Sequence, residues 1–225
     1  MFYRYKLSFM ESNMYMLFEE DAALIIDPQS SQEAVQEIKK HSVQHITVLL
    51  THEHFDHTSG VNFLRDECAD MEVMAHPLAA KFIKEAKNNR PLTLLTMVND
   101  SNRGEVLASY SSYSVTSVLV DKTLEDKETI DWKSHQIQIH YVPGHSPGGV
   151  LIVLDDKYLF SGDYMIPDTP VILRYPGGSK KDYIEKTLPY LLHLPKHLTV
   201  LPGHGEPYKL QDMEYDYDKN GFFHL

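Results

Sequence analysis

The segment THEHFDH at residues 51–57 constrains this chain more than any other. It places three histidines and two carboxylates directly after an apolar, β-rich run at residues 45–50. Neutral imidazole and carboxylate are the ligands that zinc and other borderline divalent metals prefer. A single loop histidine is usually solvated, but such a costly set of groups at the rim of a core usually has a partner. The segment therefore predicts a metal site at the end of a buried strand.

Two arrangements of this segment remain open from the residues alone. In an extended or turning loop, His52 and His54 project to the same side and can bind one ion. Asp56 and His57 could complete that site or begin a second one beside it. A purely structural zinc normally has four ligands, often with cysteine, and the single cysteine, Cys68, lies outside the cluster.

Three later segments share one form, a predicted strand that runs into a turn ending on a metal-binding residue type. They are YVPGHSPGG at 141–149 with His145, LFSGD at 159–163 with Asp163, and VLPGHG at 200–205 with His204. Glycine and proline force tight turns and let the backbone pass close to a bound ion. Two separate Pro-Gly-His turns, together with the first cluster, indicate one shared site.

Hydrophobic periodicity predicts strands and helices in both halves of the chain. The expected strands lie at 14–18, 22–26, 45–50, 72–75, 115–120, 129–132, 136–142, 150–154, 157–160 and 198–201. The expected helices lie at 31–41, with a capping box from Ser30 to Glu33, from 60 to about 68, from Pro77, and at 180–193, where Pro189 should end or kink the helix. The mixture favours a layered α/β architecture in a single domain over 1–225, with an irregular insertion near 88–134 and an acidic, peripheral tail near 211–225.

The charge balance excludes some classes of partner. The 225 residues carry 21 Lys and Arg against 32 Asp and Glu, a net charge of −11. Nucleic acids and anionic membranes require a basic footprint, so we expect neither as a partner and expect a small-molecule substrate instead. No signal peptide and no apolar run of ~18 residues is present. The expected location is cytoplasmic, and the sequence does not predict an oligomeric state.

The motifs HEHFDH at 52–57, PGHSPGG at 143–149, SGD at 161–163 and PGHG at 202–205 together resemble those of the metallo-β-lactamase superfamily in order and spacing. Within it the chain looks most like the glyoxalase II-like hydrolases, whose third segment runs on into a region resembling RYPGGS at 174–179. The resemblance implies a four-layer αβ/βα sandwich with metals at one edge between two sheets. Such glyoxalases carry a helical C-terminal domain that helps to bind glutathione. Only 21 residues follow His204 here, so we expect that domain to be absent.

Carried over motif by motif, the resemblance implies two divalent metal ions. One would be held by His52, His54 and His145, the second by Asp56, His57 and His204, and Asp163 would bridge both. Zn²⁺ is the expected metal, with Fe or Mn as alternatives. Two such ions with two carboxylates leave a residual positive charge that favours a bridging hydroxide, because zinc lowers the pKa of bound water to about 7. Asp56 is also the candidate catalytic residue that orients this nucleophile or relays its proton.

The expected function is hydrolysis of a small ester, thioester or lactone. Arg174 and Tyr175 are candidates to bind an anionic part of the substrate, and Asp27 is a candidate to orient a ligating imidazole. Three other functions remain open on the same residues. They are a phosphodiesterase for a small phosphodiester, a mononuclear-iron enzyme resembling the persulfide dioxygenases, and a metal-binding scaffold without catalysis.

Overall fold

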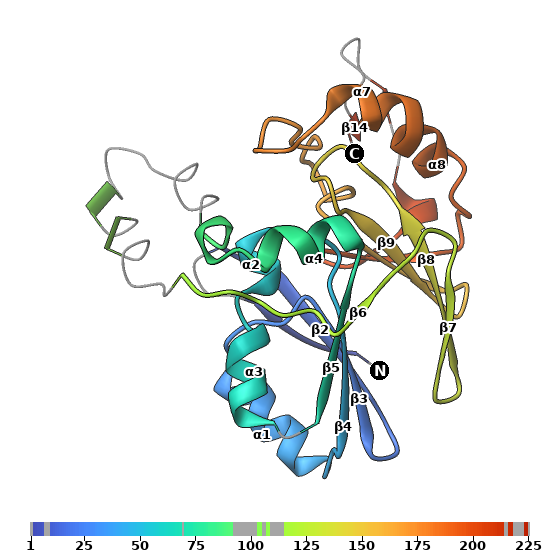
Figure 1. The fold of residues 1–225 in the computed structure, drawn as a ribbon. Coiled ribbons are helices and arrows are strands. Elements are labelled where there is room, and N and C mark those ends of the chain that lie inside the picture. Colours follow the sequence, from blue (N-terminus) through green and yellow to red (C-terminus); the bar gives the residue numbers. More distant parts are fainter. Residues whose placement is uncertain are drawn as a thin grey trace.

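The protein is a sandwich of two six-stranded sheets with helices on both outer faces (Figure 1). The computed structural model describes residues 2–6, 10–68, 70–91, 103–104, 107–108 and 115–213, and the backbone of Asp216–Tyr217 and Phe223–His224. The strand order is β1-β2-β3-β4-β5-β6 in one sheet and β12-β11-β10-β9-β8-β7 in the other. This arrangement confirms the predicted four-layer α/β fold.

The first sheet joins an antiparallel and a parallel half. Its strands are β1 (Tyr3–Lys6), β2 (Asn13–Glu19), β3 (Ala22–Ile26), β4 (His45–Leu49), β5 (Met71–Ala75) and β6 (Lys122–Thr123). The strands β1, β2 and β3 pair antiparallel, whereas β3, β4, β5 and β6 pair parallel. All five residues of β3 are buried because both faces of the sheet are covered, which explains its unbroken apolar sequence.

The second sheet is mostly antiparallel. Its strands are β7 (Thr129–Trp132), β8 (His135–Tyr141), β9 (Val150–Leu154), β10 (Tyr158–Gly162), β11 (Thr199–Pro202) and β12 (Tyr208–Lys209). The pair β10 and β11 is parallel, and the others are antiparallel. Asp155 and Asp156, both with positive φ, lie in the predicted turn between β9 and β10, which Lys157 N closes by donating to Leu154 O at 3.0 Å. A separate two-stranded ribbon pairs β13 (Asp216–Tyr217) with β14 (Phe223–His224).

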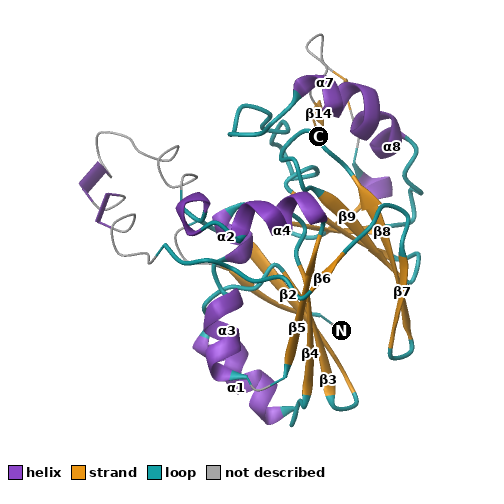
Figure 2. Ribbon diagram, in the orientation of Figure 1, coloured by secondary structure: helices purple, strands orange, loops and turns teal. Residues whose placement is uncertain are grey.

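The helices cover the outer face of each sheet (Figure 2). The first sheet carries α1 (Gln32–Lys40), α2 (Phe55–Thr58), α3 (Val61–Glu67), α4 (Pro77–Ile83) and the 3₁₀ turn η1 (Ala86–Asn88). The second carries α7 (Lys180–Asp182), the π-helical turn η2 (Tyr183–Thr187), α8 (Leu188–Leu192) and the 3₁₀ turn η3 (Leu210–Asp212). Within the part of the chain that the structure describes, no helix is long and apolar enough to cross a membrane.

Successive side chains of a strand point to opposite faces of its sheet, and this alternation produces three apolar layers. In β9, Val150, Ile152 and Leu154 pack between the sheets, while Leu151 and Val153 pack under the helices of the second sheet. A third cluster joins the outer face of the first sheet to α1, α3 and α4. Because every central strand is buried on both sides, the polar groups that follow these strands are confined to the edge where the strands end.

Three local expectations differ from the structure. Ser31, rather than Ser30, caps α1, since its side chain accepts a hydrogen bond from Ala34 N. Pro189 does not end the helix, which runs without a break from Lys180 to Leu192; the wider π turn η2 lies just before it, where the missing N–H of Pro189 would otherwise interrupt regular α-helical bonding. No strand forms over 115–120, although β6 follows closely at Lys122–Thr123.

The predicted insertion and tail fall largely outside the described residues. Residues 92–102, 105–106 and 109–114 of the insertion, and most of 214–225, are among those not described. Within the described part of 88–134, β6 and β7 each form an edge strand of a sheet. The second half of that segment therefore belongs to the sandwich itself.

Candidate metal centre

The sandwich brings together candidate ligands from four separate segments of the chain. His52 and His54 follow β4, Asp56 and His57 lie in α2, His145 follows β8, Asp163 follows β10 and His204 follows β11. These strand ends meet at one edge, between the two sheets. Three groups of ligand atoms form there, each with its atoms within 4.8 Å of one another. Their members are His52, His54, His145 and Asp163; Asp56, His57 and His204; and Asp27, His52 and His57.

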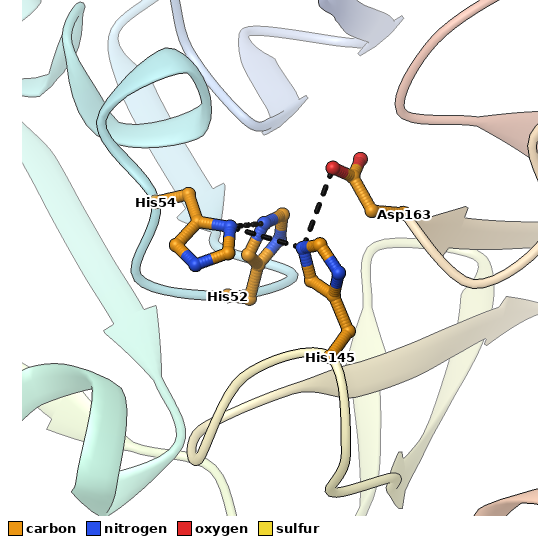
Figure 3. Close-up of side chains that lie close together, drawn as sticks. All are labelled: His52, His54, His145 and Asp163. Carbon is orange, nitrogen blue, oxygen red and sulfur yellow. Dashed lines mark hydrogen bonds and ion pairs between the residues drawn. The ribbon is translucent and has the colours of Figure 1, made fainter. Parts of the chain in front are cut away.

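In the first group, three imidazoles converge on one point (Figure 3). His54 Nδ1 lies 3.0 Å from His52 Nε2 and 3.0 Å from His145 Nε2, and His145 Nε2 lies 3.4 Å from Asp163 Oδ2. Two nitrogens that bind one zinc ion at tetrahedral geometry lie about 3.3 Å apart. The spacing of these atoms is therefore that of ligands to a single ion.

The second group lies beside the first, and Asp163 faces both. His204 Nε2 is 3.2 Å and His57 Nε2 is 3.6 Å from Asp56 Oδ2. Asp163 Oδ1 lies 3.2 Å from His57 Nε2 and 3.6 Å from His204 Nε2, while its Oδ2 faces His145. The two oxygens of one carboxylate thus face two different sets of nitrogens, which is the arrangement a bridging ligand requires.

Buried polar atoms at the centre fit a metal as their missing partner. Among the described residues, His57 Nε2 and Asp163 Oδ1 are buried and make no hydrogen bond, although they lie 3.2 Å apart. Ligand-type atoms held this close together without hydrogen-bond geometry, at the meeting point of the two groups, are suited to hold divalent ions.

Burial sets the protonation state of the first group. It lowers the pKa of His52 well below its ordinary value, lowers that of His54 to about 3, and lowers that of His145. These imidazoles are therefore neutral at pH 7. A neutral imidazole keeps the lone pair through which it can bind a metal.

The second group is charged. Burial acts to lower the pKa of His57, but the carboxylates of Asp163, Asp56 and Asp27 outweigh it and raise that pKa well above its ordinary value. Burial acts to raise the pKa of Asp163, but His204 and His57 outweigh it and hold that pKa well below its ordinary value. In the metal-free protein the proton on His57 offsets part of the negative charge, and a bound cation would take over this role.

Hydrogen bonds behind the ligands fix their orientation. Asp27 follows β3 with a positive φ of 53° and accepts hydrogen bonds from Thr51 N at 2.7 Å, Thr51 Oγ1 at 2.6 Å and His57 Nδ1 at 2.8 Å. His57 Nε2 is thereby directed toward the site. His145 Nδ1 bonds Ile172 O at 2.7 Å, which leaves its Nε2 for the first group. The structure thus shows Asp27 in the orienting contact suggested by the sequence.

Glu53 lies between two candidate ligands in sequence but outside every group of ligand atoms. Its buried carboxylate accepts hydrogen bonds from Ser146 Oγ at 3.1 Å and from Gly148 N at 3.1 and 3.2 Å. It therefore ties the 51–57 loop to the turn that carries His145. The motif alone does not distinguish this structural role from a metal-ligand role, because the hydrogen-bond partner Ser146 lies 93 residues away in the sequence.

We expect Glu53→Ala to lower the free energy of unfolding of the metal-free protein by about 3 kcal/mol, because it leaves Ser146 Oγ and Gly148 N buried without an acceptor. Glu53→Gln should cost roughly half as much. Urea unfolding of chelated protein measures both changes. The control is Glu72→Ala, an exposed glutamate on β5 that should change stability by less than about 0.5 kcal/mol. If Glu53→Ala unfolds like the parent protein, the carboxylate does not hold the turn.

A small pocket that is open to solvent lies beside His54. The residues that line it are Glu53, His54, Phe55, Phe82, Asn88, Arg90, Tyr175 and Pro176. The ring of Tyr175 lies 5.1 Å from that of His54 and 5.8 Å from that of His145. The structure thus places Tyr175 at the site. Arg174 is exposed and does not line the pocket, so the substrate-binding roles of these two residues remain predictions.

Comparison with known proteins agrees with this geometry. The sequence profile of the metallo-beta-lactamase superfamily matches residues 7–204, a range that contains all seven predicted ligands. The chain belongs to the metallo-beta-lactamase superfamily. Members of this superfamily bind divalent metals, and the groups described above supply the His and Asp side chains for such binding.

Two relatives and two solved structures illustrate the similarity. YqgX of Bacillus subtilis, a probable metallo-hydrolase, is 28% identical over 94% of this chain and 92% of its own length. GloC of Haemophilus influenzae, a hydroxyacylglutathione hydrolase, is 24% identical over 83% of this chain and 82% of its own.

Of the structures, BLEG-1, a B3 metallo-beta-lactamase, has a TM-score of 0.72 at 24% identity, covering 94% of this chain and 95% of its own. TTHA1623, solved in a di-iron-bound form, has a TM-score of 0.68 at 25% identity, covering 93% and 95%. These similarities group the chain with the metallo-hydrolases of the superfamily.

Proposed function

We propose that this protein hydrolyses a small ester, thioester or lactone at a centre of two divalent metal ions, with glyoxalase II-like thioesters as the first substrates to test. The observation that carries the proposal is the position of Asp163, whose two oxygens face two separate groups of nitrogens at 3.2–3.6 Å. The neighbouring pocket gives a small molecule access to His54. The similarity to GloC, named for thioester hydrolysis, supports the thioester class.

Each predicted ligand has a defined place in this proposal. His52, His54 and His145 would hold one ion, Asp56, His57 and His204 the other, and Asp163 would contact both. Bound divalent ions would polarise the scissile carbonyl and lower the pKa of a water molecule. Zinc is the proposed metal, and iron is the alternative to test beside it because TTHA1623 has been solved with two iron ions.

The side chains of this chain would position the reactants. Asp27 fixes the ring of His57, and the Ile172 carbonyl fixes that of His145. Asp56 is buried, and its pKa is lowered because His57 and His204 outweigh the effect of burial, so it is ionised at pH 7. An ionised carboxylate at this position can accept a hydrogen bond from the attacking water and so orient it, whereas its lowered pKa makes it a weak proton acceptor.

The test is a substrate panel on protein stripped of metal and reconstituted with zinc or iron. The panel contains S-lactoylglutathione, an aryl thioacetate, a lactone, bis-p-nitrophenyl phosphate and a persulfide with oxygen uptake. We expect metal-dependent hydrolysis of a thioester, ester or lactone above the phosphodiester rate. Preferred cleavage of the phosphodiester would establish the phosphodiesterase instead, and oxygen uptake with the persulfide would establish an oxygenase. Binding of metal without turnover of any substrate would contradict an enzymatic role.

A further inference from the structure

The pocket beside His54 has an apolar wall and one cationic side chain. Phe55, Phe82 and Pro176 supply the apolar surface, and Arg90 is the only Lys or Arg among the described residues that line it. None of these residues belongs to a group of metal-ligand atoms. The pocket therefore presents an apolar surface to solvent next to the candidate metal centre, with the exposed Arg90 among the residues that line it.

The turn that carries Arg90 is held in place by side-chain amides. Asn88 Nδ2 donates to Phe82 O at 2.9 Å, and the buried Asn89 donates to Ile83 O and Thr116 O, both at 2.6 Å. Arg90 N donates to Asn88 O at 3.0 Å. These bonds anchor the end of α4 and the residues after it, so the backbone of Arg90 is fixed relative to the pocket.

Arg90 is an exposed positive charge in an acidic protein. Within the described part of the chain it forms no ion pair, although the whole chain carries a net charge of −11. The one carboxylate that lines the pocket, Glu53, is already bound by Ser146 Oγ and Gly148 N. Among the described residues that line the pocket, no carboxylate is therefore engaged with Arg90.

We propose that this pocket selects an anionic substrate: a small thioester or ester in which a flat apolar segment separates the scissile carbonyl from a carboxylate, and Arg90 binds that carboxylate. A guanidinium and a carboxylate form paired, charge-assisted hydrogen bonds, which give both affinity and orientation. The apolar segment lies against Phe55 and Phe82. The inference rests on the proposed function and specifies its substrate class.

The experiment uses two pairs of thioesters, each an anion and its uncharged amide of equal shape. The first pair, S-acetyl para-mercaptobenzoate and S-acetyl para-mercaptobenzamide, differs in the charge on the thiol half of the thioester. The second pair, the S-phenyl thioesters of para-carboxybenzoic and para-carbamoylbenzoic acid, differs in the charge on the acyl half. The proteins compared are the metal-loaded parent, Arg90→Gln and Arg90→Lys. The matched control is Lys87→Gln, which removes an equal charge from the exposed side of η1, outside the pocket.

We expect Arg90→Gln to lower kcat/KM for the anion by about tenfold in at least one pair, to change the amide by less than about twofold, and to be partly rescued by Arg90→Lys. Lys87→Gln should leave all four values within about twofold. Equal losses for anion and amide would assign Arg90 a structural role and overturn the proposal. Unchanged anion rates in both pairs would also overturn it, as would a selective loss in Arg174→Gln but not in Arg90→Gln.

A failure of the proposed function gives a different result, since none of the four thioesters would then be hydrolysed. In that case calorimetry with para-(methylthio)benzoate, a thioether that cannot be cleaved, decides the inference. Binding that Arg90→Gln weakens about tenfold, with no such effect on the corresponding amide, supports the anion pocket. Equal dissociation constants for parent and variant contradict it.

Discussion

Replacing Asp163 by alanine is expected to lower kcat/KM by about 10³-fold and to leave less than one equivalent of bound metal. The structure places Asp163 Oδ1 3.2 Å from His57 Nε2 and Oδ2 3.4 Å from His145 Nε2, so this one carboxylate serves both ligand groups. Its removal also takes away a negative charge that would balance part of the positive charge of two divalent cations. A loss of about 4 kcal/mol of transition-state stabilisation corresponds to this factor.

Metal analysis by mass spectrometry and steady-state kinetics on the best substrate of the panel measure these effects together. Circular dichroism should show the same secondary structure as the parent protein, because Asp163 lies at the edge of the sandwich and outside its three apolar layers. Asp131→Ala, which removes an exposed aspartate from β7, is the matched control and should retain both metal and rate. Full metal content and activity in Asp163→Ala would refute its bridging position.

Gly203→Ala is expected to disrupt the centre without removing any ligand. A Cβ at this position would lie 2.6 Å from Asp163 Oδ1, 2.7 Å from His57 Cε1 and 3.0 Å from the carbonyl carbon of Gly162. The surrounding backbone is fixed by hydrogen bonds from Gly203 N to Gly162 O and from Asn13 N to Gly203 O. The added methyl group must therefore displace both ligands, and a displacement of about 1 Å can cost about 10²-fold in rate.

The readouts for Gly203→Ala are metal affinity, by competition with a chelator, and kcat/KM. Gly104→Ala provides the control, because a Cβ there would meet no atom of the described residues within 4 Å. Gly104→Ala should behave as the parent protein in both assays. Parent-like metal affinity and rate in Gly203→Ala would show that Asp163 and His57 do not need their present positions.

The sequence was sufficient to predict the residues that gather at the centre. Each candidate ligand lies in a segment that comes after a strand, and the layered fold brings the ends of those strands to one edge. The local reason is visible in the chain itself, since Gly144 and Gly162 adopt the positive φ values that the turns before His145 and Asp163 require. The fold class is likewise confirmed, through the order of strands in the two sheets and the match to the superfamily.

The surroundings of the centre could not be predicted in the same way. The pocket joins Phe82 in α4 and Arg90 after that helix to Tyr175 in a distant loop, and no local pattern marks that proximity. Glu53 illustrates the same limit, because its partners Ser146 and Gly148 come from another motif. Such contacts depend on how the two sheets pack, which is a property of the whole chain rather than of any segment.

Anomalous diffraction from crystals of the metal-loaded protein, recorded at the absorption edges of zinc and iron, tests the central claim most directly. We expect two peaks about 3.5–4 Å apart. One should contact His52, His54 and His145, the other Asp56, His57 and His204, with one oxygen of Asp163 directed at each. A single peak, or peaks bound by other side chains, would contradict a centre of two metals built from these seven residues.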